Sequence, residues 1–233
     1  VTLVVSDGEL TDSQQWSVKV VRLYEVTIGI VGNGTTSPEP GNHTFVEGTE
    51  VSVYAYPDSA WTLSNWLLNG TDVGSANPYN LTMDSNYNLT AFFVEIRYEL
   101  VIEVEGNGIT IPVPGVYTYL EDSNVTVQAV PDSGWDISYW LLDEVNVGSE
   151  VNYTVTMDSN HNLTAVFARI QYQLTIQVVG NGTTSPAPGS YMYAYGTEVN
   201  LTASADPGWA FSEWTGDASG TDPSTVIIMD GNK

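Results

Sequence analysis

The sequence has no cysteine, and it has only 5 lysine and arginine residues against 28 aspartate and glutamate residues. The absence of cysteine excludes disulfides, thiolate metal sites and cysteine nucleophiles. The net charge of −23 disfavours contact with nucleic-acid phosphates or with anionic membrane surfaces. Because no apolar run reaches the roughly 18 residues that a membrane span needs, direct membrane insertion of this segment is not expected.

Residues that favour β-strands make up most of the apolar segments. Hydrophobic residues account for 42% of the chain, and valine, threonine, tyrosine and tryptophan suit the pleated, half-buried surface of a sheet. No long segment has the apolar spacing of an amphipathic helix. The sequence therefore predicts an all-β protein.

Internal self-similarity is the strongest pattern in the sequence. Gly106 follows Gly32, and Gly180 follows Gly106, by 74 residues, and tryptophans recur at the same spacing. The recurring positions include Trp61, Trp135 and Trp209; Trp66, Trp140 and Trp214; and, in a slightly shorter third unit, Met83, Met157 and Met229. This register predicts three copies of one module in tandem. We expect an elongated rod with modules at residues 23–95, 96–169 and 170–233, after a partial immunoglobulin-like hairpin at residues 1–22.

Each module is expected to consist of short strands joined by tight turns. In the first module, apolar residues alternate over Tyr24–Ile30 and Val51–Ala55, which predicts strands with one buried face. The Gly-Asn-Gly motif at 32–34 allows the positive φ of a tight turn. The last two strands are expected at Tyr79–Met83 and Asn88–Phe93.

The third module stops at Lys233, which matches Tyr87 of the first module. We expect it to lack the closing strand, which leaves an unpaired edge and part of a core exposed. Either the sequence is a piece of a longer chain, or a neighbouring subunit donates the strand. In the second case residues near Val1–Val5 or Trp16–Val21 of another chain are expected to pair with residues 170–233.

The recurring tryptophans have two interpretations. Exposed aromatic rings can stack on sugars, whereas a module of about 70 residues needs large side chains to fill its small core. Because the tryptophans keep step with the repeat and lie beside Leu67-Leu68 and Leu141-Leu142, packing in the core is favoured.

The Asn-x-Thr motif of N-glycosylation is abundant. These motifs also arise by chance where asparagine and threonine are common, but glycans on a surface protein would add bulk and solvation. The candidate acceptors are Asn33, Asn42, Asn69, Asn80, Asn88, Asn124, Asn152, Asn162, Asn181 and Asn200.

Calcium is a weak candidate ligand, and no other cofactor is expected. Asp7, Glu9 and Asp12 crowd one predicted hairpin loop, and carboxylate oxygens are the donors that calcium prefers. Aspartate in a turn more often caps its own backbone. The two histidines, His43 and His161, occupy different places in their modules, so neither is expected to belong to a recurring site. Nothing marks a Ser-His-Asp arrangement, so catalysis is not expected.

Three segments carry a resemblance to a known family. Tyr172–Gly189, Tyr195–Ala203 and Asp206–Phe211 resemble the divergent internalin-B B-type repeat of bacterial and archaeal surface proteins, and the resemblance extends over residues 23–233. The first two modules depart from it where Trp-Leu-Leu replaces Trp-Thr-Gly. Residues 1–20 resemble the last two strands of a polycystic-kidney-disease-like domain, an immunoglobulin-like fold. Both resemblances imply a secreted or surface-anchored protein whose modules serve as spacers or adhesive arms without catalytic residues.

The pattern as a whole predicts a non-catalytic extracellular protein, a structural or adhesive segment of a surface stalk or fibre. One alternative is a subunit of an extracellular filament assembled by strand donation. A second is an accessory carbohydrate-binding region of a secreted hydrolase. The expected partners are neighbouring copies of the chain, other surface proteins and glycans.

Overall fold

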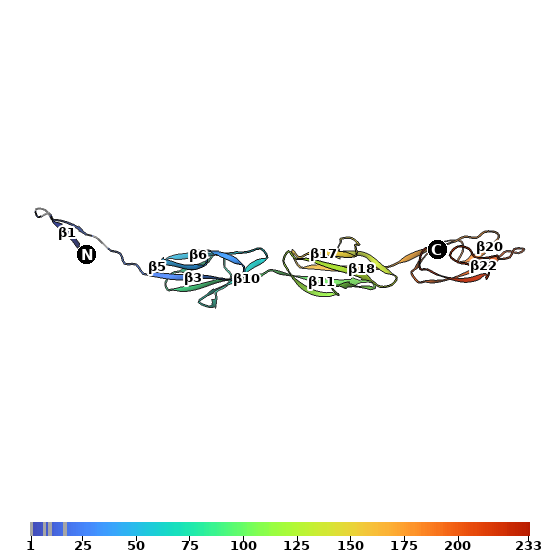
Figure 1. Cartoon of the computed structure of the whole chain (residues 1–233), viewed down its shortest axis with the longest axis horizontal. Coiled ribbons are helices and arrows are strands. Elements are labelled where there is room, and N and C mark those ends of the chain that lie inside the picture. Colours follow the sequence, from blue (N-terminus) through green and yellow to red (C-terminus); the bar gives the residue numbers. More distant parts are fainter. Residues whose placement is uncertain (1, 7, 9–10, 16–17) are drawn as a thin grey trace. The chain divides into compact units, whose positions relative to one another are not determined.

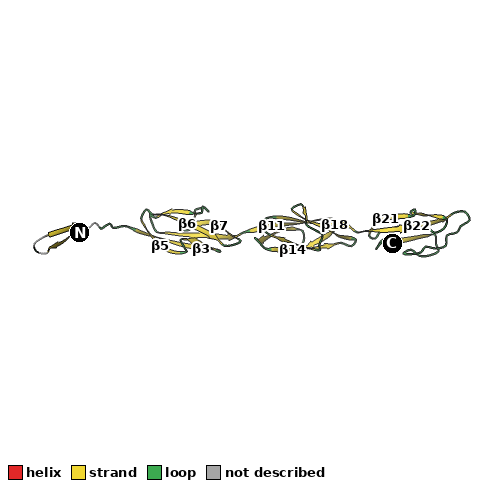
Figure 2. Ribbon diagram, turned by 90° about the horizontal axis from the view of Figure 1, so that it is seen from above, coloured by secondary structure: helices red, strands yellow, loops and turns green. Residues whose placement is uncertain are grey.

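The computed structural model describes residues 2–6, 8, 11–15 and 18–233, and every regular element among them is a β-strand (Figures 1 and 2). We call residues 23–95, 96–169 and 170–233 repeats 1, 2 and 3. The chain divides into two compact units, residues 1–97 and 98–233. The first unit contains repeat 1, and the second contains repeat 3 and all but the first residues of repeat 2.

An N-terminal hairpin precedes repeat 1. Strand β1 (Thr2–Ser6) pairs antiparallel with β2 (Thr11–Gln15), and Val4 lies opposite Ser13. Its assignment to an immunoglobulin-like domain stays a prediction.

Repeat 1 is built from two sheets. The five-stranded sheet has the order β5-β3-β10-β7-β8, and the three-stranded sheet has the order β4-β6-β9. The strands are β3 (Leu23–Val31), β4 (Gly34–Ser37), β5 (Gly41–Val46), β6 (Glu50–Pro57), β7 (Trp61–Leu68), β8 (Thr71–Asp72), β9 (Tyr79–Thr82) and β10 (Tyr87–Glu95). The Gly-Asn-Gly segment links β3 of the larger sheet to β4 of the smaller one, whereas the Asn69-Gly70 turn, with positive φ at both residues, joins the paired strands β7 and β8.

The first and last strands of repeat 1 lie side by side in the middle of the larger sheet. Strand β10 pairs parallel with β3, with Leu89 opposite Ile28, and antiparallel with β7, with Ala91 opposite Trp66. The closing strand is therefore the central strand of the sheet, and without it β3 and β7 would have no shared neighbour.

Repeat 2 has the same two sheets, in the orders β13-β11-β18-β15-β16 and β12-β14-β17. Its closing strand again pairs parallel with its first strand, with Leu163 opposite Ile102. The strands are β11 (Arg97–Glu105), β12 (Gly108–Ile111), β13 (Gly115–Leu120), β14 (Asn124–Pro131), β15 (Trp135–Leu142), β16 (Val145–Asn146), β17 (Asn152–Thr156) and β18 (His161–Arg169).

Repeat 3 keeps the smaller sheet, β20-β22-β23, but only the pair β19-β21 of the larger one. Within its described residues there is no counterpart of β10, and residues 209–216 form a single bridge from Trp214 to Gly220 in place of a counterpart of β7. The strands are β19 (Gln171–Ile176), β20 (Gly182–Ser185), β21 (Gly189–Ala194), β22 (Glu198–Ala205) and β23 (Ser224–Ile228).

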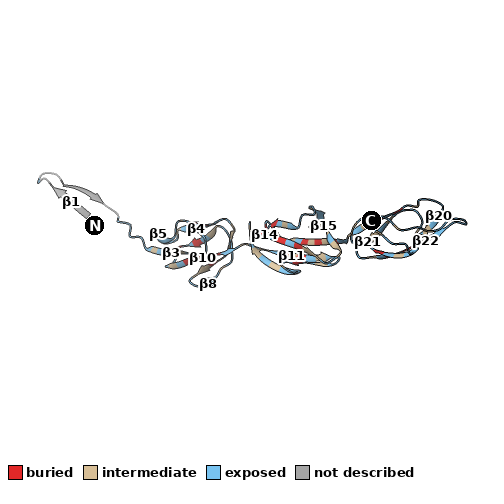
Figure 3. Cartoon of the chain, turned by 45° about the vertical axis from the view of Figure 1, so that its right-hand side comes forward, coloured by how far each residue is buried: buried red, intermediate tan, exposed pale blue. Residues whose placement is uncertain are grey.

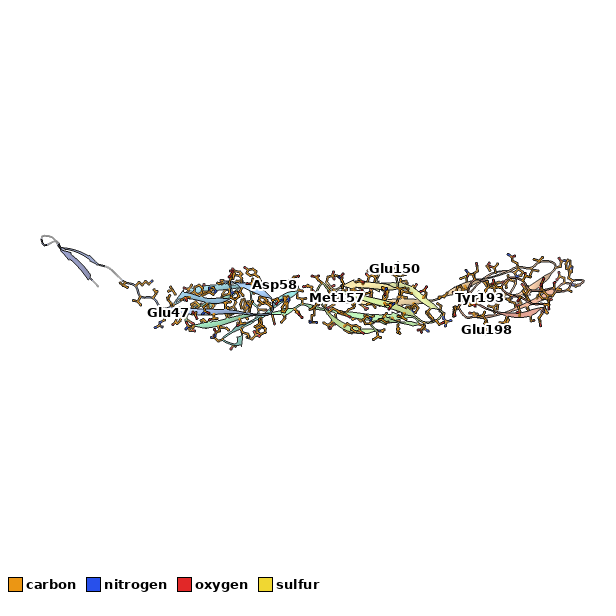
Figure 4. All side chains as sticks on the ribbon, in the orientation of Figure 1. Glu47, Asp58, Glu150, Met157, Tyr193 and Glu198 are labelled. Atoms are coloured by element: carbon orange, nitrogen blue, oxygen red, sulfur yellow. The ribbon has the colours of Figure 1, made fainter. Side chains whose placement is uncertain are left out.

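Each repeat encloses its own core between its two sheets (Figure 3). Burial alternates along the strands, as in β6, where Val51, Val53 and Ala55 are buried and the residues between them are exposed. The methionine at the end of the smaller sheet, labelled as Met157 in Figure 4, is fully buried in all three repeats. Burial of these side chains is the main stabilisation of each small sandwich.

Candidate functional site

Trp66 and Trp140 belong to the cores of their repeats. Both are fully buried. The indole N–H of Trp66 donates to the Ala76 carbonyl oxygen at 3.0 Å, and that of Trp140 donates to the Glu150 carbonyl oxygen at 2.8 Å (Glu150 is labelled in Figure 4). A buried ring with a satisfied N–H has no face left for a sugar. The packing interpretation therefore holds for these two tryptophans.

The tryptophans of repeat 3 are more exposed than their counterparts in repeats 1 and 2. Trp214, the counterpart of Trp66, is only half-buried, and its ring centroid lies 5.5 Å from that of Phe211. Trp209, the counterpart of the half-buried Trp61 and Trp135, is 57% exposed. The physical reason is that these rings pack against the closing strand in repeats 1 and 2.

The two glycines of each Gly-Asn-Gly motif make room for a phenylalanine of the closing strand. A Cβ added at Gly32 would lie 2.4 Å from the Phe93 carbonyl oxygen, and one added at Gly34 would lie 2.8 Å from the Phe93 ring. In repeat 2, a Cβ added at Gly106 would lie 2.4 Å from the Phe167 carbonyl oxygen, and one added at Gly108 would lie 2.8 Å from the Phe167 ring. These glycines are therefore needed for close approach as well as for their turn.

The same motif in repeat 3 faces a groove. A Cβ added at Gly180 would meet the Trp209 ring at 3.6 Å, and no phenylalanine among the described residues fills this place. The groove has a volume of about 320 Å³ and is lined by residues that include Gly182, Thr184 and Phe211. A second hollow of about 160 Å³ lies beside Ile176. Together they mark the position that β10 and β18 fill in the other repeats.

A turn after each buried methionine carries a recurring polar clasp. An aspartate contacts the side chain three residues later, which is a different residue type in each repeat: Asp84 with the Tyr87 hydroxyl, Asp158 with His161 and Asp230 with Lys233. An asparagine in the same turn accepts a hydrogen bond from the first strand: Asn86 from Glu25 N–H, Asn160 from Glu99 N–H and Asn232 from Gln173 N–H. The clasp therefore fastens the end of the smaller sheet to the first strand of the larger one.

The expectation that neither histidine belongs to a recurring site is wrong for His161. His161 follows Tyr87 by 74 residues and takes its place in the clasp, whereas His43 only contacts the nearby Glu39 carbonyl oxygen. The sequence does contain a signal for this clasp, because an aspartate recurs at 84, 158 and 230 while the residue three positions later differs in each repeat. Repeat 2 also has an aspartate, Asp143, at the position of Asn69 in repeat 1, which places a second acidic side chain near His161.

His161 lies between two carboxylates in repeat 2. Its Nδ1 is 2.7 Å from Asp143 Oδ2, its Nε2 is 2.9 Å from Asp158 Oδ1, and its side chain is 11% exposed. Because both ring nitrogens face acceptors, the doubly protonated imidazolium fits best. Burial alone would lower the pKa of His161, but the hydrogen bonds and charges of the two carboxylates raise it above 6.5. The pKa of each partner carboxyl is lowered in turn.

We expect the stability of repeat 2 to fall as the pH rises above 6.5. The folded pKa of His161 is raised, so its contribution is complete below the unfolded value of 6.5 and is lost as the pH passes through the folded value. The measurement is the urea midpoint of repeat 2 between pH 6 and 9. The variant His161→Tyr, which installs the clasp of repeat 1, should remove this dependence. An unchanged dependence in the variant would show that His161 does not cause it.

All ten candidate glycosylation asparagines are exposed. Several use their side-chain oxygen within a sheet, as Asn42 does in accepting from Thr27 at 3.0 Å and Asn80 in accepting from Ser52 at 2.7 Å. That arrangement leaves Nδ2, the atom that a glycan would modify, directed away from the bond. Asn162 differs because its Nδ2 donates to Glu103 at 3.2 Å.

The weak calcium candidates fall largely outside the described residues, so a calcium site at this hairpin stays a prediction. Asp7 and Glu9 lie outside the described residues, and of Asp12 only the backbone in β2 is described. Among the residues that are described, no group of three or more histidine and acidic side chains is arranged to hold a metal ion. None of the described segments forms a helix of the length and apolarity that a membrane crossing requires.

The fold defines a tandem array of small β-repeats. The sequence profile of the divergent InlB B-repeat domain matches residues 24–97, 98–171 and 172–233, so the chain belongs to the divergent InlB B-repeat family. No curated protein matches the chain. Among solved structures, the Bacillus anthracis TIE protein is similar at 10% sequence identity and a TM-score of 0.41, over 99% of this chain and 55% of that one. The chain thus spans about half the length of that protein.

Proposed function

We propose that the chain is a non-catalytic segment of an extracellular surface protein, in which the repeats act as a stalk that transmits tension. Its partners are neighbouring copies of itself or other surface proteins. The family supports a surface location for this kind of repeat. The acidic surface supports it further, because a net charge of −23 keeps such a segment solvated and free of nucleic acid.

The observation that carries this proposal is the parallel pairing of the first and last strands. In repeat 1 the chain enters at the start of β3 and leaves at the end of β10, and the two strands are paired over Tyr87–Phe92. Because the strands are parallel, these two points lie at opposite ends of the pair. Tension along the chain therefore shears the strands and loads all of their hydrogen bonds together, whereas an unzipping pull would break them singly. Repeat 2 has the same pairing over His161–Val166.

The residues that recur support the same conclusion. In repeats 1 and 2, recurring residues of three types line the core or make tight contacts, as Trp66, Met83 and Gly106 do. The two histidines do not recur at matching positions. The repeat is thus organised around building a sandwich and not around a shared reactive group.

Glycosylation of the exposed asparagines is the expected surface modification in an organism that performs it. The test is mass spectrometry of peptides released by protease treatment of intact source cells. We expect peptides from this chain in the released fraction, with glycan masses on several of the ten sites and least on Asn162, whose Nδ2 is engaged. Recovery of the chain only after cell lysis would contradict the proposed location. Unmodified asparagines in released peptides would contradict only the glycosylation.

For the carbohydrate-binding alternative, burial of Trp66 and Trp140 removes the recurring ring pair on which it depended.

A further inference from the structure

We propose that Tyr54 and Tyr56 of repeat 1 form a stacking surface for the first sugars of a glycan attached to Asn80. The stacking rests on the proposed function, in which exposed asparagines such as Asn80, the acceptor of an Asn-Leu-Thr motif, are glycosylated. Attachment forms a bond from Asn80 Nδ2 to the anomeric carbon of the first sugar. The bond from that carbon to the phosphate of an activated sugar donor breaks, and Nδ2 gives up one proton.

The two tyrosines lie next to each other on the outer face of the smaller sheet. Both belong to β6, whose opposite face supplies Val53 and Ala55 to the core. Tyr54 is 43% exposed and Tyr56 is 51% exposed. Their ring centroids are 6.5 Å apart, and the ring planes differ by 18°. Repeat 1 therefore presents two neighbouring, nearly parallel aromatic rings to solvent.

Asn80 lies on the same face of the sheet, on the neighbouring strand β9. It is exposed, whereas Leu81 beside it is buried in the core. The register pairs Asn80 with Ser52, so Asn80 is a diagonal neighbour of Tyr54. Diagonal neighbours in an antiparallel pair are roughly 7–8 Å apart, which is within reach of an aromatic side chain. A sugar on Asn80 therefore begins beside the ring of Tyr54.

A hydrogen bond holds the acceptor side chain against the sheet. Ser52 Oγ donates to Asn80 Oδ1 at 2.7 Å. Glycosylation replaces one hydrogen of Nδ2 and leaves Oδ1 an acceptor, so this bond is kept in the modified chain. Because the base of the glycan is already oriented, less conformational entropy is lost when the sugars settle on the rings.

Hydroxyl groups border the rings on the side away from Asn80. Ser37 stands opposite Tyr54 and Thr35 stands opposite Tyr56, both on strand β4, and both are exposed. A sugar has an apolar C–H face, which suits an aromatic ring, and hydroxyl groups at its rim, which suit serine and threonine. The outer face of this sheet offers both kinds of contact.

The tyrosines and the acceptor are present together in repeat 1 and absent together from the other two repeats. The residues at the matching positions are Gln128, Val130 and Thr154 in repeat 2 and Thr202, Ser204 and Val226 in repeat 3. These outer-face positions contribute nothing to the cores. Their joint change is expected if the rings serve the asparagine beside them.

Asn152 is a matched acceptor without an aromatic neighbour. It lies on β17, at the edge of the corresponding sheet of repeat 2, and stands opposite Gln128. Its diagonal neighbours on β14 are Thr126 and Val130. A glycan on Asn152 is therefore expected to extend into solvent, and it serves as the internal control.

The test compares the full chain from a host that attaches N-glycans with the same chain from a host that does not. Mass spectrometry of proteolytic peptides gives the occupancy of Asn80 and Asn152. In NMR spectra, nuclear Overhauser effects should connect sugar protons of the Asn80 glycan with the rings of Tyr54 and Tyr56, and ring currents should shift those sugar protons upfield. The Asn152 glycan should show neither effect. Glycosylation should also raise the urea midpoint of repeat 1.

The matched variant carries Tyr54→Gln and Tyr56→Val, the residues that repeat 2 has at these positions. Because both positions are exposed, the variant should fold as the unmodified chain does. It should lose the upfield shifts and more than half of the glycan-dependent gain in urea midpoint. The variant Tyr54→Phe keeps the ring and should retain both.

Three results would overturn the stacking proposal. The first is a glycan on Asn80 whose protons do not contact the tyrosine rings. The second is an unmodified Asn80 in a chain that is glycosylated at Asn152, which would leave the proposed glycosylation standing, whereas a chain without glycans would contradict both. The third is a free oligosaccharide that binds the unglycosylated chain on both tyrosines, which would assign the surface to a foreign glycan.

Discussion

Replacing Trp140 by alanine is expected to destabilise repeat 2 by about 3–5 kcal/mol, the range typical of large aromatic truncations in cores. The indole is fully buried, and its N–H donates to the Glu150 carbonyl oxygen at 2.8 Å. Truncation therefore removes packing in the core of repeat 2 together with the hydrogen bond to the Glu150 carbonyl oxygen. A small sandwich has few other large side chains to compensate.

The matched control for Trp140→Ala is Trp209→Ala in repeat 3. Trp209 is 57% exposed, so its loss should cost less than about 1 kcal/mol. A second variant, Trp140→Phe, keeps most of the packing and loses the hydrogen bond, and should cost about 1–2 kcal/mol. The measurement is urea unfolding followed by hydrogen exchange, which resolves residues 98–169 from the rest. Equal costs for Trp140→Ala and Trp209→Ala would contradict the core assignment.

Replacing Gly106 by alanine is expected to destabilise repeat 2 by about 2–6 kcal/mol, the sum of a backbone penalty of about 1–3 kcal/mol and overpacking of a similar size. The φ of Gly106 is +84°, and an added Cβ would lie 2.4 Å from the Phe167 carbonyl oxygen. The backbone of β18 would have to move, because the clash is with a main-chain atom of that strand.

Gly180→Ala in repeat 3 isolates the steric part of this effect. Its φ of +93° imposes a similar backbone penalty, but its added Cβ would meet only the Trp209 ring at 3.6 Å. We expect it to cost about 1–3 kcal/mol, from the backbone alone. The difference between the two variants measures the contact with the closing strand. If both cost the same, close approach of that strand does not explain the glycine.

Much of the fold follows from the sequence because its signals are local. Alternation of apolar residues over Val51–Ala55 marks a strand with one buried face, and the structure places β6 there. The Gly-Asn-Gly motifs mark turns, and the 74-residue register marks three copies of one module. Tryptophan in a small module marks a core, and Trp66 and Trp140 are in fact buried.

Strand order could not be predicted in the same way. Nothing in the composition of Asn88–Phe93 says that it pairs parallel with β3, because the pairing joins residues that lie far apart in the sequence, such as Tyr87 and Val26. The clasp of His161 follows only in part from the sequence. Asp158 lies three residues before His161, but the contact with Asp143 is made only when β15 and β18 pair. In repeat 3, the exposure of Trp209 depends on what fills the groove beside it.

Single-molecule stretching of the chain from its two ends tests the proposed role of the repeats most directly. Parallel pairing of β3 with β10 and of β11 with β18 predicts two separate unfolding events of similar force. Each should lengthen the chain by roughly 200–250 Å, given about 3.3–3.6 Å per extended residue. Repeat 3, where β19 pairs only with β21 in its sheet, should yield at a lower force. Repeats 1 and 2 yielding at a force no higher than that of repeat 3 would contradict the account.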